Sequence, residues 1–409
     1  MIKKSHYYQY SSHSIFSFFF FSFIFLCPLS AFATPLIALK EANNCGGCHK
    51  PGRSQRPVLW RRCTLDCQGC HVDPNGAGPR NAWGAYYAQD QMAALKFFQE
   101  EDPLKDESRL DLHLDQRTMI RQSGEKTRGF PMNTEMSLRI RPFVKWLHFT
   151  GQLLYLGRPG DGIEAKLPEG VRRKIEKFHV QVDGLPMNMH IKAARGTPLY
   201  GVRRPNHSLW IRERIGLDQF SLQDFISVGG TPNVPFMHMS QMYGDPFSAE
   251  EDKQKGISAH AGLRGVTLGW HVNGSHWRTQ SQKAFVDMNA IGVGANILGL
   301  VVYGERNWRK VSEKALSVSD LIELDSIALR LHPSSRIQEV TVAGTWFPGV
   351  MFGVVGEWLE DDERSSRRVS QFIDIHPIPF FQLEIWRRTE SGSRTLRDTL
   401  AVAHVLFDF

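Results

Sequence analysis

The chain has few cysteines, no blocks of one charge, and no long apolar run beyond its first residues. Only six of its 409 residues are cysteine, and its Lys and Arg are scattered, although the formal net charge is +7. After the N-terminal segment, no stretch reaches the roughly 18 apolar residues of a membrane-spanning helix. These absences argue against a helical membrane protein and against nucleic-acid binding.

Residues 1–33 are organised as an export signal. Lys3 and Lys4 precede an apolar run at 15–26. This run has about 12 residues, whereas a spanning helix needs roughly 20, so a cleaved signal is favoured over an uncleaved anchor. The small-x-small pattern at 31–33 supplies a cleavage site. We therefore expect an exported protein whose mature chain begins near Thr34.

Two copies of one cysteine motif follow the signal: C-G-G-C-H at 45–49 and C-Q-G-C-H at 67–71. C-x-x-C-H is the attachment sequence of c-type haem, in which both thiols bond to the porphyrin and the histidine ligates the iron. We therefore expect two covalently bound haem c groups. Their predicted attachment residues are Cys45, Cys48, Cys67 and Cys70, and their predicted proximal iron ligands are His49 and His71.

A zinc site and a disulfide framework are the alternatives. The spacing C-x2-C followed by a second C-x2-C also fits a zinc ribbon, but a four-cysteine zinc site does not require a histidine after each pair. Export to an oxidising compartment also opposes thiolate zinc sites. Disulfides cannot pair all five remaining cysteines within the chain, and Cys63 is left without an assigned role. Haem attachment is the favoured interpretation of the two motifs.

The sixth ligand of each iron is not fixed by the motifs. Met92, His113 and Met119 are the candidates that follow in the sequence. No feature places the acid and base groups of a haem enzyme, so electron transfer is favoured over catalysis.

From residue 134 onward, apolar and polar residues alternate in segments broken by turns. This period of two predicts β-strands with one apolar face, and we expect about 16 of them, with 14 as the alternative. Charged and strongly polar residues occupy the alternate positions, as a water-filled lumen requires. Histidines at such positions are predicted to face the lumen: His148, His179, His190, His271 and His404.

Two further features favour a membrane barrel over a soluble β-protein. Long polar connections such as 243–256 alternate with short ones, as extracellular loops alternate with periplasmic turns. The chain also ends on an apolar strand with Phe409, which resembles the C-terminal signature of bacterial outer-membrane proteins. The expected organisation is a signal peptide at 1–33, a small helical diheme domain with its linker at 34–130, and a barrel at 131–409.

This order of parts resembles the fused cytochrome–porins of iron-oxidising bacteria. The resemblance implies an outer-membrane electron conduit that exchanges electrons with a periplasmic carrier and an extracellular donor or acceptor, with its haem domain periplasmic or within the lumen. The chain departs from the family by carrying two haem motifs where one is usual, which leaves the direction of electron flow open. The alternative is a solute porin whose N-terminal domain is a plug held by zinc or disulfides.

Overall fold

The computed structural model describes the greater part of the region that follows the haem motifs. The described residues are 94–95, 109–142, 144, 146–156, 174–201, 217, 222–231, 235–265, 270–297, 300–313, 334–347, 349–361, 365–378, 380–392 and 395–408. Among them, no helix is long and apolar enough to cross a membrane. The three-residue 3-10 turn η6 (Pro186–Asn188) is the one helical element of this part of the chain.

Sixteen strands make up the described fold. Their bounds are β1 (Leu110–Ser123), β2 (Lys126–Ile140), β3 (Leu147–Leu156), β4 (Lys174–Leu185), β5 (Met189–Gly196), β6 (Gln223–Gly230), β7 (Pro235–Gly244), β8 (Lys255–Arg264), β9 (His271–Gln280), β10 (Ala284–Ile297), β11 (Leu300–Glu313), β12 (Ser334–Phe347), β13 (Val350–Asp361), β14 (Ser365–Ile378), β15 (Phe381–Ser391) and β16 (Leu396–Asp408).

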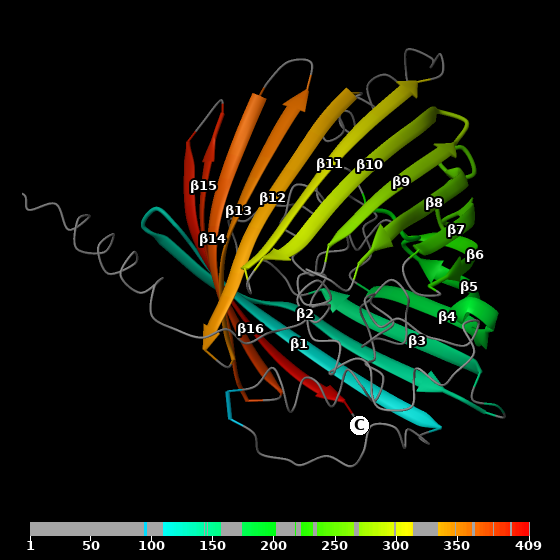
Figure 1. Ribbon diagram of the computed structural model, residues 1–409, viewed down its shortest axis with the longest axis horizontal. Coiled ribbons are helices and arrows are strands. Elements are labelled where there is room, and N and C mark those ends of the chain that lie inside the picture. Colours follow the sequence, from blue (N-terminus) through cyan, green and yellow to red (C-terminus); the bar gives the residue numbers. More distant parts are fainter. Residues whose placement is uncertain are drawn as a thin grey trace, which may run out of the picture.

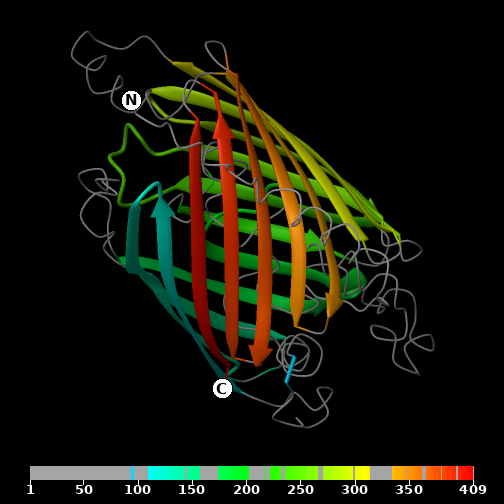
Figure 2. The ribbon, with the colours of Figure 1, turned by 90° about the vertical axis from the view of Figure 1, so that its left-hand side faces the viewer.

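The strands form one closed barrel (Figure 1). Each strand pairs antiparallel with the next in sequence, and β1 pairs with β16 from His113 opposite Asp408 to Ser123 opposite Asp398. Figure 2 shows this seam, where the last strands lie beside the first two. Closure satisfies the backbone N–H and C=O groups of every strand within the sheet, which is the condition for crossing a bilayer with strands. The predicted mainly-β fold with a 16-strand antiparallel barrel is thereby confirmed.

The barrel begins earlier in the chain than residue 131, because Leu110–Ser123 is already its first strand. Two local features hide the alternation there. The pairing of β1 with β2 shifts register between Arg117 and Thr118, and Pro131 lies inside β2. The predicted helical diheme domain lies almost wholly outside the described residues and stays a prediction.

The two ends of the barrel differ in their connections. At the end where β1 begins and β16 ends, neighbouring strands are joined by short segments such as 186–188 and 298–299. At the opposite end the connections include 157–173, 197–222 and 314–333. This asymmetry is that of outer-membrane barrels, in which short turns are periplasmic and long loops extracellular. The end that carries the termini of the barrel is therefore the periplasmic end.

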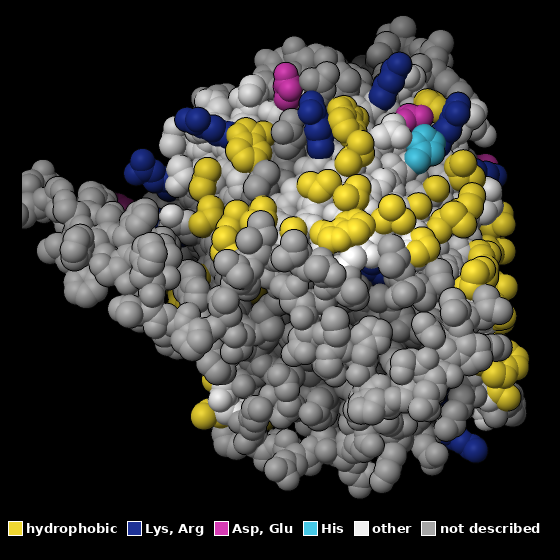
Figure 3. All heavy atoms as spheres, viewed as in Figure 1, with side chains coloured by type: hydrophobic (Ala, Val, Ile, Leu, Met, Phe, Trp, Pro, Cys, Tyr) yellow, Lys and Arg dark blue, Asp and Glu magenta, His cyan; other side chains and the backbone are white. Residues whose placement is uncertain are grey.

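The outer face is an apolar band with aromatic residues near both edges. Large exposed hydrophobic side chains alternate along the strands, among them Leu110, Leu112, Met136, Leu138, Ile226, Val228, Met237, Met239, Ile291, Val293, Val354 and Val369. Figure 3 shows such side chains as a band across one face, with Lys and Arg above it. Trp146 and Trp270 mark the periplasmic edge, and Tyr155, Tyr243 and Trp358 the other. A lipid-facing surface has this composition.

Candidate functional site

The candidate site is the inner wall of the barrel, which is polar along most of its length. Inward-facing side chains alternate with the outward apolar ones, and many of them are buried polar or charged groups. The predicted lumen position is confirmed for His148, His179, His190 and His404, which are all buried between outward-facing neighbours. His271 is half-buried at the first position of β9. Sequence reasoning did not single out His238 and His260, which lie in the same inner face.

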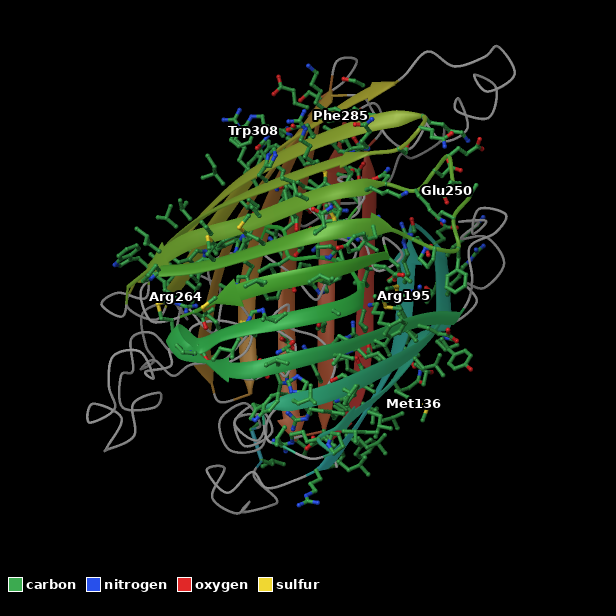
Figure 4. The ribbon with its side chains drawn as sticks, turned by 90° about the vertical axis from the view of Figure 1, so that its right-hand side faces the viewer. Met136, Arg195, Glu250, Arg264, Phe285 and Trp308 are labelled. Atoms are coloured by element: carbon green, nitrogen blue, oxygen red, sulfur yellow. The ribbon has the colours of Figure 1, made fainter. Side chains whose placement is uncertain are left out.

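Inward residues of β5 to β9 form one coherent surface, here named the donor wall. Its members are His190, Lys192, Ser227, His238, Ser240, Ser258, His260, Asn273 and Ser275. Every one of these side chains can donate a hydrogen bond, and none of them is an acid. Figure 4 views these strands from outside the barrel, with Arg264 and Arg195 labelled at their opposite ends.

The strand register aligns part of the donor wall into a rung of imidazoles. His190 lies opposite Gly229, Gly229 opposite His238, and His238 opposite His260, which in turn faces Ser275. The ring centroids of His190 and His238 are 5.3 Å apart, and those of His238 and His260 are 6.3 Å apart. His260 Nδ1 lies 2.7 Å from Ser275 Oγ. Directly opposite side chains of an antiparallel sheet are neighbours, so the imidazoles form a continuous row.

Gly229 makes this arrangement possible. A Cβ built at this glycine would lie 2.5 Å from Cε1 of His190 and would overlap Nδ1 of His238. The rings of His190 and His238 therefore close over a position where any other residue would hold them apart. A conformational preference does not explain this glycine, because the structure gives it no positive φ. Its role is to leave space for two imidazoles.

A second rung lies two residues further along each strand. Lys192 faces Ser227, Ser227 faces Ser240, and Ser240 faces Ser258. Inward residues two positions apart on a strand are about 6.7 Å apart, so a row of hydroxyls that ends in an ammonium runs beside the row of imidazoles.

The inward charges of β13 to β16 and β1 form a different surface, here named the paired wall. Its members are Asp115, Arg117, Glu357, Arg368, Asp374, Glu384 and His404. Arg368 Nε donates to Glu357 Oε2 at 2.6 Å, with both side chains buried. Arg117 Nε donates to Asp115 Oδ2 at 2.7 Å. Each arginine of this wall is thus paired with an acid, and the acids Asp374 and Glu384 lie 3.2 Å from His376 and 3.6 Å from His404.

The chain that precedes the barrel contacts its periplasmic end. Ala94 N donates to His376 O at 2.8 Å, and Leu95 N donates to Pro377 O at 3.0 Å. Gly349, in the neighbouring β12–β13 turn, permits the approach, because a Cβ there would lie 2.7 Å from Ala94 N. Residues 94–95 therefore lie at the end of the barrel at which β14 ends.

Ion pairs at the extracellular end link a loop to a neighbouring turn. Glu250, in the β7–β8 loop, accepts a hydrogen bond from Lys253 Nζ at 2.5 Å, and this bond lowers the pKa of the Glu250 carboxyl. Lys283, in the β9–β10 turn, lies 2.9 Å from Glu251 Oε1, and its hydrogen bond to Glu251 raises the pKa of the ammonium. These exposed charges lie at the rim of the barrel.

Of the predicted haem residues, only His113 and Met119 lie among the described residues. Cys45, Cys48, His49, Cys67, Cys70, His71 and Met92 lie outside the described residues, as do Cys63 and Phe409. His113 and Met119 both lie on β1, with His113 buried in the inner wall and Met119 packed against the buried apolar cluster. Six residues of strand separate them by about 20 Å, so they could not ligate the same iron. Their roles as distal ligands, and both haem groups, stay predictions.

No group of three or more His, Cys, Asp or Glu side chains that could hold a metal ion occurs among the described residues. The imidazole rung therefore does not form a ready three-ligand metal site. Two of its members, His190 and His238, remain adjacent, but the nearby charges of Lys192 and Arg264 oppose a cation at this place.

No family model matches the sequence, and no curated protein matches it. Among solved structures, the fold is similar to that of a loop L8 deletion mutant of OmpT, an outer membrane protein of Vibrio cholerae. The TM-score is 0.52 at 12% identity, over 73% of this chain and 99% of that chain. It is also similar to the outer membrane channel DcaP of Acinetobacter baumannii, with a TM-score of 0.52 at 10% identity over 73% and 97%.

A third similar structure is an anion-selective porin from Comamonas acidovorans. The TM-score is 0.51 at 10% identity, and the match covers 73% of this chain and 98% of that chain. At such identities the likeness concerns the fold alone. It supports the porin-like barrel in the predicted cytochrome–porin plan and gives no support to the cytochrome part. A closed 16-strand barrel of this fold, with an apolar outer band, places the chain in the outer membrane.

Proposed function

We propose that this chain forms a porin-type channel that admits small polar solutes across the outer membrane. The observation that carries the proposal is the polar inner wall of a closed barrel whose outer face is apolar. A bilayer excludes charged solutes because a bare charge in hydrocarbon costs several kcal/mol or more. A barrel of this kind offers a hydrated passage through a layer about 25 Å thick.

The neighbours in fold support this function better than they support an electron conduit. Two of them are described as a channel and as an anion-selective porin. The plug held by zinc or disulfides, which the solute-porin alternative included, rests on cysteines outside the described residues and has no structural support of its own.

Planar-bilayer recording of the purified full chain tests the proposal. We expect stepwise increases of current when protein that migrates as a folded barrel is added, because each inserted barrel opens one aqueous path. Protein boiled in detergent is the control and should add no current. Folded barrel that inserts into lipid vesicles but conducts no ions and releases no small sugars would contradict the channel.

A second candidate function is an outer-membrane electron conduit, favoured by the two C-x-x-C-H motifs. The contact of Ala94 and Leu95 with the periplasmic end of the barrel supports it further, because these two residues follow the second motif in the chain. When bound, haem c would supply one-electron redox chemistry. The partners would be a periplasmic electron carrier and an extracellular donor or acceptor, which the chain itself does not identify.

A pyridine haemochrome spectrum, combined with metal analysis, separates the two candidates. Protein made with an intact cytochrome-maturation system should contain two thioether-linked haems per chain if both motifs are used. The variant Cys67→Ala/Cys70→Ala should lose the second haem and keep the first. Protein without haem would remove the electron-transfer candidate and leave the channel, and bound zinc would identify the plug.

A further inference from the structure

The donor wall contains a buried hydroxyl for which the described residues offer no partner. Ser258 is 2% exposed, and its Oγ has no hydrogen-bond partner among the described residues. His238, one rung away, is 7% exposed and makes ring contacts with His190 and His260. Buried polar groups are normally paired, because an unsatisfied one costs about 1–3 kcal/mol. The hydroxyl of Ser258, beside the ring of His238, therefore points to a ligand.

The charges around His238 indicate which class of ligand would bind at the donor wall. His190, His260, Lys192 and Arg264 all lie within electrostatic range of His238. Among the described residues, the buried acids lie on β1, β11, β13 and β14: Asp115, Glu305, Glu357 and Asp374. On β6, Asp224 is paired with Arg195 at the extracellular edge. A ligand at the donor wall thus meets N–H and O–H donors and positive charge.

An anion with several acceptor oxygens satisfies these groups together. Its oxygens would accept from the imidazole of His238 and the hydroxyl of Ser258, which belong to rungs about 6.7 Å apart along the strands. The ammonium of Lys192 supplies the charge, and hydrogen bonds between charged groups are roughly twice as strong as neutral ones. A divalent metal would gain imidazole ligands but would meet the repulsion of Lys192 and Arg264.

We propose that the donor wall binds the oxyanion of a small carboxylate or phosphate compound, with His238, Ser258 and Lys192 as the contacting residues. The inference rests on the proposed channel function, in which this surface is a binding site for anionic solutes that pass through the lumen. The same chemistry has a second source within the chain, since each predicted haem carries two propionate carboxylates. Both sources present anionic oxygens to the same donors.

Block of chloride current by inorganic phosphate tests the site in planar bilayers. In the native channel we expect a saturable fall of chloride conductance as phosphate is added. His238→Leu and Lys192→Met should each raise the half-blocking concentration about tenfold, as expected for loss of one charge-assisted hydrogen bond. His276→Leu is the matched control, because His276 lies on the outer face of β9 and bonds Asn289 at 2.9 Å. It should leave the block unchanged.

The source of the oxyanion is distinguished by repeating the titration on protein that lacks all four motif cysteines. Equal block in the two preparations identifies a free solute. Block that appears only after the haems are removed identifies propionates as the resident occupant, and either result supports the site. Half-blocking concentrations that are unchanged by His238→Leu and Lys192→Met would overturn it, and so would zinc block that His238→Leu abolishes while phosphate has no effect.

Failure of the channel function would be recognised separately. If the folded barrel carries no current, calorimetric titration of phosphate into the detergent-solubilised full chain still tests the donor wall. Binding that Lys192→Met weakens about tenfold would support the site without a channel. Absence of binding to both the native chain and the cysteine-free chain would overturn it.

Discussion

The two walls of the lumen differ in how their buried polar groups are paired. On the paired wall, Arg368 and Glu357 meet at 2.6 Å, and Arg117 and Asp115 at a similar distance. On the donor wall, imidazoles, hydroxyls and an ammonium lie side by side with no acid among them. Charges that are paired within the wall offer little to a solute. Side chains that can donate hydrogen bonds, with no acid among them, suit a ligand that accepts hydrogen bonds.

The largest effect is expected from breaking the paired wall. Arg368→Leu leaves Glu357, which is fully buried, without this cation, and removal of one partner of a buried pair costs about 3–5 kcal/mol. The free energy of unfolding, measured by urea titration of the heat-modifiable band, reports the loss.

The double variant Glu357→Leu/Arg368→Leu is its control. Replacement of both charges by apolar groups removes the stranded charge, so the double variant should recover most of the stability. If the single and double variants were equally unstable, the charge of Arg368 would not be what compensates the buried charge of Glu357.

A smaller effect is expected from Gly229→Ala on the donor wall. The added Cβ must push apart His190 and His238, and such overpacking costs about 1–3 kcal/mol. Gly151→Ala, on β3, is the matched control because nothing lies within 4 Å of its added Cβ. Unfolding by urea should separate the two variants, and equal stability would mean that the imidazole rung is not closed over Gly229.

The smallest effect is expected at the rim, where charges are paired in water. The pKa of Glu250 lies below its ordinary value of 4.5, first of all because Lys253 donates to it. A carboxyl with a lowered pKa contributes its pairing above the ordinary value and loses it as the pH falls through the folded value. The carboxyl carbon of Glu250 should therefore titrate below pH 4.5 in nuclear magnetic resonance spectra. Lys253→Met should bring the midpoint back toward that value.

Much of the barrel could be predicted from the sequence. A strand with one face in lipid and one in water must alternate apolar and polar residues, and this alternation is visible in the sequence. The alternation is clear from Met136 to Ile140 and in the strand that ends near Phe407. Leu110–Ser123 carries it too, but the polar residues around its register shift at Arg117 and Thr118 obscure it. The sequence therefore predicts this first strand as part of the linker.

The candidate site was less predictable, because it depends on register between strands. The sequence indicates that His190 faces the lumen, but the strand pairing alone brings it beside His238 across Gly229. A glycine that makes room for two imidazoles looks in the sequence like any other glycine of a strand. The haem motifs, in contrast, can be recognised from the sequence alone, because C-x-x-C-H does not depend on strand register. Both motifs lie outside the described residues.

The ion selectivity of the open barrel depends on the charge of the donor wall. In planar bilayers with a gradient of potassium chloride, the ammonium of Lys192 on a wall without acids should give a reversal potential of the sign for anion preference. Lys192→Glu should move that potential toward cation preference, because it places an acid on the wall that has none. A native channel that prefers cations, with a reversal potential unchanged by Lys192→Glu, would show that the donor wall does not attract anions.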